Sequence, residues 1–167
     1  ESGLHDVNRF ITLPPHPNSG YQSVPDYVDM TLEDGVSDLY SPHEVSAMIH
    51  KRSDDALAYV ESCGAVNQKE LQYVLNDIKT MGFLGKYYAH KIAGATNLAL
   101  FRKKRDPVYR EDAVKELEMA LKFWVKYVAT ALSQNLNPVW LNRVGHVHWE
   151  ELTAEVRKDI DIARNDK

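Results

Sequence analysis

The fold is decided by residues 67–104, which read NQKELQYVLNDIKTMGFLGKYYAHKIAGATNLALFRKK. Apolar side chains recur there every three or four residues, the spacing of one face of an α-helix, and the next proline is Pro107. A continuous helix of this length measures about 57 Å, whereas a compact domain of this size has a radius of gyration of about 15 Å. The stretch therefore forms one long, bent helix, which we favour, or breaks near Gly82 or Gly85.

Helix start signals stand before this stretch and at its beginning. Ser41-Pro42-His43-Glu44 combines a capping serine, a proline at the first helical position and a glutamate three residues after the serine. It predicts a helix that ends at Gly64, because glycine is favoured just past a helix end. Asn67 and Glu70 repeat the capping pattern, so we expect the long helix to begin at Asn67. Cys63, close to the first helix end, is interpreted as a small buried residue.

Two more helices are expected after the long one. Asp106-Pro107 supplies an N-cap and a first helical residue, and the following apolar stripe, which includes Leu117 and Trp124, ends near Asn135. A fourth stripe runs over 149–163, and residues 136–147 between them are expected to be a loop. Strand-like alternation of useful length is missing from the sequence, so residues 41–167 are predicted to form an all-α bundle of four or more helices.

The first forty residues have a different character. Pro14, Pro15 and Pro17 fix the backbone and disfavour helix before each of them. Large apolar residues are interspersed, which a disordered linker would not carry. We expect residues 1–40 to be an extended, Pro-rich segment packed along the bundle, with a short helix near 26–32, and the whole chain to be a single domain.

Composition narrows the class of function. The net charge of −4 argues against nucleic acid as a partner, and apolar runs fall short of the roughly 18 residues that a membrane span needs, so we expect no membrane partner. The single cysteine, Cys63, excludes an internal disulfide and a multi-cysteine zinc site. Glu1 stands where an initiator methionine would, which suggests a processed product or a piece of a longer protein.

Chemical motifs are sparse. The cations at 102–105 fit a helix C-terminus, where they interact favourably with the helix dipole, better than a nucleic-acid patch. His146 and His148 are spaced like metal ligands, but capping or hydrogen bonding explains them as well. We found no nucleophile elbow, P-loop or dinucleotide fingerprint. We therefore expect no metal, no cofactor and no catalytic residues. Whether the chain is an enzyme stays open, but we expect no catalysis from the isolated chain.

The densest group of binding side chains lies between residues 137 and 149. Trp140, Arg143 and His146 stand close to His148 and Trp149, and aromatic planes beside such groups are what sugar binding uses. Our candidate ligand-binding residues are Trp140, Arg143, His146 and, from the first forty residues, Tyr21. The alternative is that Trp140 and Trp149 close the end of the bundle as buried aromatics.

Three stretches resemble a helical region near the C-terminus of large secreted carbohydrate-active proteins of gut-type Bacteroidetes, which are labelled glycosidase-like, α-glucuronidase-like or carbohydrate-binding. They are NSGYQSVPDYV (18–28), MGFLGKYYAHKIAGA (81–95) and NRVGHVHW (142–149). The resemblance runs over most of residues 18–164 and carries no catalytic residue onto this chain. It implies a non-catalytic accessory domain of a secreted, periplasmic or cell-surface protein. Its partners would be the remainder of that protein and an oligosaccharide.

Two other functions stay open. Small residues at helical spacing, among them Gly82, Gly85 and Ala89, allow a tight helix pair like a tetratricopeptide unit, which would make the chain a protein–protein interaction module. A small catalytic unit that uses residues 137–149 is the third possibility. An accessory domain predicts an exposed apolar patch, an interaction module predicts a concave groove, and an enzyme predicts a pocket with perturbed titratable groups.

Overall fold

The structure is a computed structural model that describes residues 4–141 and 145–167. These residues form six helices and one short hairpin: α1 (Val7–Thr12), α2 (Val24–Leu32), α3 (Pro42–Ser62), α4 (Lys69–Lys104), α5 (Pro107–Leu132), β1 (Val139–Leu141), β2 (Gly145–Val147) and α6 (Leu152–Asn165). The prediction of an all-α helical bundle is confirmed.

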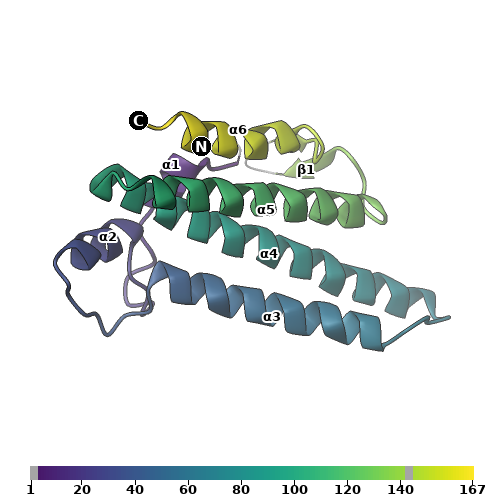
Figure 1. The fold of residues 1–167 in the computed structure, drawn as a ribbon. Coiled ribbons are helices and arrows are strands. Elements are labelled where there is room, and N and C mark those ends of the chain that lie inside the picture. Colours follow the sequence, from purple (N-terminus) through teal and green to yellow (C-terminus); the bar gives the residue numbers. More distant parts are fainter. Residues whose placement is uncertain (1–3, 142–144) are drawn as a thin grey trace.

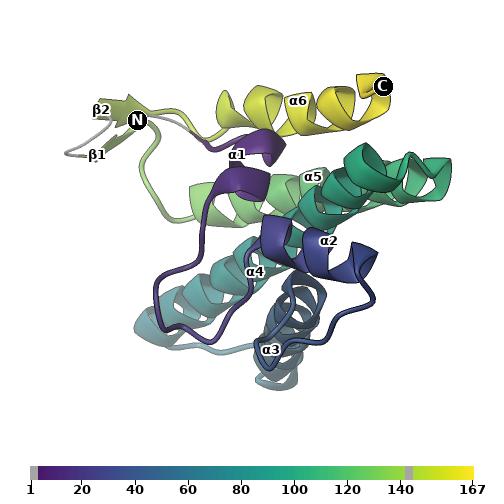
Figure 2. The same ribbon diagram turned by 90° about the vertical axis from the view of Figure 1, so that its left-hand side faces the viewer.

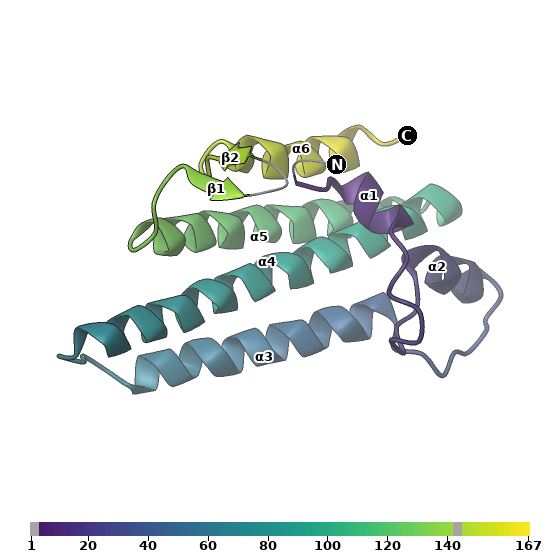
Figure 3. The ribbon, with the colours of Figure 1, turned by 180° about the vertical axis from the view of Figure 1, so that it is seen from behind.

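The long helices lie side by side in chain order. Figure 1 shows α3, α4, α5 and α6 as successive rows, with α3 at one edge and α6 at the other. The end-on view in Figure 2 shows α1 and α2 at the near end of the bundle, where each packs on α4. From behind, the β1–β2 hairpin lies next to the start of α6 and well away from α3 (Figure 3). Helix α3 is therefore an outer element with α4 as its main neighbour.

Helix α4 is continuous over 36 residues, about 54 Å at the usual rise. The favoured prediction of one long helix is thus correct, and it does not break at Gly82 or Gly85. It begins at Lys69 rather than Asn67. Gln68 is its N-cap residue and makes no side-chain capping bond, so the expected capping by Asn67 does not occur.

The flanking start signals act as the sequence predicts. Ser41 Oγ accepts a hydrogen bond from the Glu44 N–H at 3.2 Å, and the Glu44 carboxylate accepts one from the Ser41 N–H at 2.8 Å, which completes a capping box. Asp106 Oδ1 accepts the Val108 N–H at 3.0 Å at the start of α5. These two local interactions set where α3 and α5 begin.

The N-terminal segment is more helical than expected. Helix α1 was missed: it has six residues, its N-cap Asp6 accepts the Arg9 N–H at 2.9 Å, and it buries Val7 and Ile11. So short a helix has too few turns to show a periodic stripe and is stabilised by packing. The short helix expected near 26–32 exists as α2 and begins earlier, at Val24.

Four expectations further along the chain differ from the structure. The loop expected at 136–147 contains the β1–β2 hairpin, whose three-residue strands are too short for alternation to reveal them. Helix α6 begins at Leu152 rather than Trp149, and α5 ends at Leu132 before Asn135. Cys63 is exposed, because it lies at the C-cap of the outer helix α3.

The core lies between the C-terminal half of α4 and the helices on its far side from α3. Leu117 and Trp124, predicted on the apolar stripe of the third helix, are both buried. Two clusters make up this core. The larger is Val7, Ile11, Val24, Val28, Ala95, Leu98, Ala99, Leu100, Phe101, Ala113, Leu117, Ile160 and Ala163, and the smaller is Tyr87, Ala120, Trp124, Tyr127, Val128, Ala131 and Val156.

A buried ion pair ties the N-terminal segment into this core. Lys91 on α4 and Asp159 on α6 are 1% and 2% exposed, and their charged atoms lie 2.9 Å apart. Lys91 Nζ also donates to the His5 carbonyl at 2.5 Å and to the Tyr87 hydroxyl at 3.0 Å. Asp159 Oδ1 accepts the Val7 N–H at 2.7 Å. Burial lowers the pKa of Lys91 and raises that of Asp159, so the charges persist only because each has the other.

Candidate functional site

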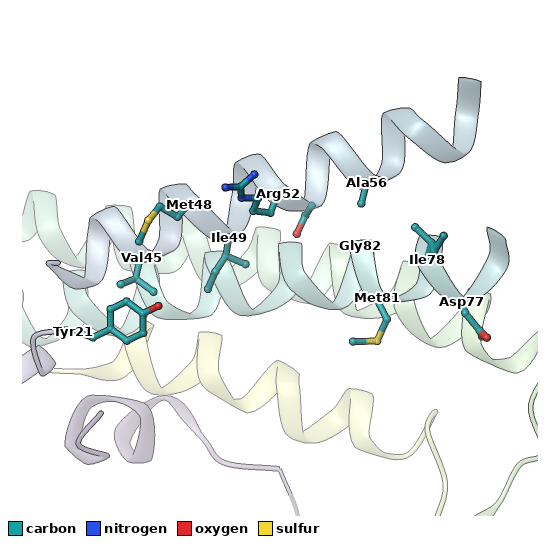
Figure 4. Close-up of a pocket in the computed structure, with 11 residues that line it drawn as sticks. Tyr21, Val45, Met48, Ile49, Arg52, Ala56, Asp77, Ile78, Met81 and Gly82 are labelled. Atoms are coloured by element: carbon teal, nitrogen blue, oxygen red, sulfur yellow. The ribbon is translucent and has the colours of Figure 1, made fainter. Parts of the chain in front are cut away.

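A groove of about 750 Å³ runs between α3 and α4. Figure 4 shows its side chains along the facing sides of the two helices, with Tyr21 of the N-terminal segment at one end. The lining is mostly apolar, with Arg52 and Asp77 as its charged members. The full set is Tyr21, Val45, Met48, Ile49, Arg52, Ser53, Ala56, Asp77, Ile78, Met81 and Gly82.

Two glycines explain how the helices meet at this groove. A Cβ at Gly82 would lie 2.9 Å from Leu57 Cγ, and one at Gly85 would overlap the Ser53 hydroxyl. A side chain at either position would therefore have to displace Leu57 or Ser53 of α3, so the two glycines permit close helix contact. The larger side chains that flank the contact, such as Met48 and Met81, then stand at its edge, where the chain itself does not cover them.

Helix α3 is poorly buried for its length. Of its 21 residues, all within the described part of the chain, only Pro42, Ser46 and Ser53 are buried, and none of these is a large apolar residue. Met48 is 39% exposed and Met81, across the groove, is 62% exposed. Contiguous exposed apolar side chains of this kind mark contact surfaces. An accessory domain predicts such a patch.

A polar cluster lies where α3, α4 and α5 meet. His90 Nδ1 and Glu116 Oε2 are 2.7 Å apart, and the rings of His50 and His90 meet edge to face with centroids 4.3 Å apart. Burial lowers the pKa of His50, His90 and Lys86 lower it further, and Asp54 and Glu116 oppose them. The cluster thus brings ionisable side chains of α3, α4 and α5 together.

A second histidine near Glu116, His43, also has a lowered pKa. Burial lowers the pKa of His43, against the carboxylate of Glu116. Sequence reasoning did not find this cluster, although His43 and His50 are seven residues apart and therefore share a helix face. Among the described residues, no group of three or more His, Cys, Asp or Glu side chains could hold a metal ion.

The β1–β2 hairpin carries the other candidate surface. Trp140 pairs with His146 in the antiparallel register, and their rings meet edge to face with centroids 5.1 Å apart. Trp140 is 61% exposed, whereas Trp149 packs against Tyr127 at the edge of the smaller core cluster. The two tryptophans therefore differ in their surroundings. Trp149 packs on the core as the buried-aromatic alternative expects, whereas Trp140 lies on the surface.

The structure brings together two of the four predicted ligand-binding residues, Trp140 and His146. Tyr21 lies elsewhere, beside Tyr40 at the end of the α3–α4 groove. Arg143 lies outside the described residues. Tyr21 is separated from the hairpin because its segment lies where α3 begins and α4 ends, whereas the hairpin follows α5 toward the other end of the bundle (Figure 3).

The four cations at 102–105 lie at the C-terminus of α4, as their helix-end interpretation requires. Arg102 bonds to Asp166 and to Asn8 at 2.6 and 2.7 Å, and Lys103 lies 2.9 Å from Asp29. These side chains join the two chain ends to α4. In the described part of the chain, no helix is long and apolar enough to cross a membrane.

Comparison with known proteins gives one structural likeness. No protein-family model matches the sequence, and no curated protein matches it. The fold is similar to part of a solved structure, a GH138 enzyme targeting pectin rhamnogalacturonan II, with a TM-score of 0.79 and 15% sequence identity. The match covers 98% of this chain and 27% of that chain. At this identity the likeness shows the fold alone: this helical arrangement also occurs as about a quarter of a larger carbohydrate-active enzyme.

Proposed function

We propose that this chain is a non-catalytic helical accessory domain of a carbohydrate-processing protein, and that it packs on the catalytic domain through the α3–α4 groove. The protein would act outside the cytoplasm, in the periplasm, at the cell surface or as a secreted protein. The observation that carries the proposal is the uncovered apolar side of α3 and α4, with Met48 and Met81 at its edge.

The energetics of the groove favour a protein partner. Burial of apolar surface contributes about 25 cal/mol per Å², so a surface that carries several exposed large side chains gains by being covered. Arg52 and Asp77 add one charge of each sign to the lining, and a partner with matching charges would set the register of docking. The likeness to part of a GH138 enzyme supports a catalytic domain as that partner.

The tetratricopeptide-like alternative is less well supported. A tetratricopeptide repeat has about 34 residues divided between two helices, and at least three repeats are needed for a stable stack. Helix α4 alone has 36 residues, longer than a whole repeat. The groove between α3 and α4 is therefore better explained as an interdomain surface than as one unit of a solenoid.

The test begins with the gene. The reading frame on both sides of these 167 codons is determined, and the neighbouring domain is expressed as a separate polypeptide with this chain. Met48→Glu with Met81→Glu is expected to abolish co-purification, because two carboxylates would be desolvated in the interface. Val125→Glu is the matched control, since Val125 is exposed on α5 outside the groove.

Two results would contradict the proposal. One is a neighbouring domain without a glycoside-processing activity. The other is a neighbouring domain that binds the groove variant and the control variant equally well.

A further inference from the structure

The hairpin is fixed at its base by contacts to the bundle. Trp149, just after β2, packs against Tyr127 of α5 with ring centroids 5.3 Å apart. Its backbone N–H donates to Asn137 Oδ1 at 3.3 Å, and Asn137 Nδ2 donates to the Glu150 carboxylate at 3.1 Å. The segment before β1 and the segment after β2 are thereby joined to each other and to the core.

The Trp140 indole is held by the hairpin itself rather than by the core. His146 faces it across the two strands, and a Cβ at the neighbouring Gly145 would lie 3.8 Å from Trp140 Cζ3, ordinary van der Waals distance. More than half of the side chain nevertheless faces solvent. The ring contact with His146 restricts the rotamers of the indole, and a side chain restricted before binding costs less entropy to immobilise.

The chemistry around the ring is polar. His146 and His148 are exposed, and the carboxylates of Glu150 and Glu151 follow directly. An aromatic face is slightly negative and attracts the slightly positive C–H groups of a sugar ring, while imidazole and carboxylate groups donate to and accept from hydroxyls. We infer that Trp140 and His146 form an oligosaccharide-binding site in which a pyranose ring stacks on the indole.

Other ligand classes fit this surface less well. A tryptophan at the centre of a protein interface sits in an apolar patch from which water is excluded, whereas the ring that Trp140 contacts is the exposed imidazole of His146. The carboxylates of Glu150 and Glu151 would repel the phosphates of a nucleic acid. The inference concerns a different surface from the α3–α4 groove and does not depend on what docks there.

The test uses the indole N–H signals of Trp140 and Trp124 as separate reporters. The 167-residue chain, labelled with nitrogen-15, is titrated with rhamnogalacturonan II fragments, oligogalacturonides and cello-oligosaccharides. The expected result is a saturable shift of the Trp140 indole N–H signal with at least one of these sugars. The Trp124 signal should stay in place, because that N–H donates to the Thr153 hydroxyl of α6.

Variants then separate binding from folding. Trp140→Ala is expected to weaken sugar binding by about tenfold or more with an unchanged melting temperature, and Trp140→Phe should retain part of the affinity. Leu136→Ala is the control: Leu136 is highly exposed just before the hairpin, and its removal should leave binding unchanged.

The inference is overturned if none of these sugars produces a saturable shift, or if the shift persists in Trp140→Ala. Unfolding of Trp140→Ala would show a structural role and also overturn it, as would a Trp140 signal that responds only to the neighbouring domain. The co-purification test of the groove is read separately, so the failure of either idea is recognised on its own.

Discussion

Replacing Lys91 by methionine should destabilise the chain more than most single substitutions. Methionine keeps most of the length of the side chain but removes the ammonium group. The Asp159 carboxylate, 2% exposed and 2.9 Å from Lys91 Nζ in the native chain, would then keep the Val7 N–H as a bonded donor but lose its countercharge. The carbonyl of His5 and the hydroxyl of Tyr87 would also lose a donor.

The size of the effect follows from what is left behind. Breaking a buried ion pair by removing one partner costs about 3–5 kcal/mol, because a charge stays buried without compensation. A domain of this size is stable by only about 5–15 kcal/mol, so the loss is a large fraction of the total. Lys91→Met with Asp159→Leu should cost much less than the sum of the two single changes, since the double variant buries no charge.

The assay is urea denaturation followed by circular dichroism at neutral pH. The matched control is Asp54→Ala. It removes the ion-pair partner of Lys86, which lies on α4 as Lys91 does. That pair is closer, at 2.6 Å, but Asp54 is 62% exposed, so the expected cost is about 0–1 kcal/mol. A Lys91→Met chain as stable as the Asp54→Ala chain would refute the argument, as would simple additivity of the two changes at Lys91 and Asp159.

Three further predictions also concern the stability of the chain, measured by urea denaturation, by thermal melting or as a function of pH. Leu117→Ala should cost about 2–5 kcal/mol and Trp124→Ala about 3–5 kcal/mol, because both side chains are buried; melting shifts within error would contradict this. Gly94→Ala should cost about 1–3 kcal/mol, because its Cβ would lie 2.8 Å from Leu117 Cγ, and the cost should shrink when Leu117 is already alanine. The folded chain lowers the pKa of His50 below 6.5. The contribution of neutral His50 to stability is therefore complete above about pH 6.5 and is lost as the pH falls through the lowered pKa. His50→Gln should flatten the dependence of stability on pH in this range, and an unchanged slope would contradict the prediction.

Much of the fold could be predicted because its signals are local. The capping box at Ser41 and Glu44 and the Asp106-Pro107 pair fix the starts of α3 and α5 through bonds between residues two or three apart. The apolar stripe of α5 identifies its buried face, as Leu117 and Trp124 show, whereas the long helix α3 buries no large apolar residue. The short elements escaped prediction: α1 has six residues and each hairpin strand has three, too few for a period to appear.

The candidate site could be predicted only in part. Residue types and their density singled out the segment around Trp140 and His146, and the structure brings these two side chains together. Which tryptophan would be buried was undecidable, because Trp140 and Trp149 have similar neighbours in the chain. That choice depends on Tyr127, more than twenty residues earlier on α5, which packs against Trp149.

The sequence by itself therefore determined that the chain is helical, where α3 and α5 begin, and which helix faces are apolar. Tertiary structure decided what those faces meet. Lys91 acquires Asp159 as its partner from a helix 68 positions further along the chain, and His50 meets His90 because two glycines let α3 approach α4. Capping and helical periodicity act over a few residues, whereas burial and the pKa shifts that follow from it arise from contacts between segments distant in the sequence.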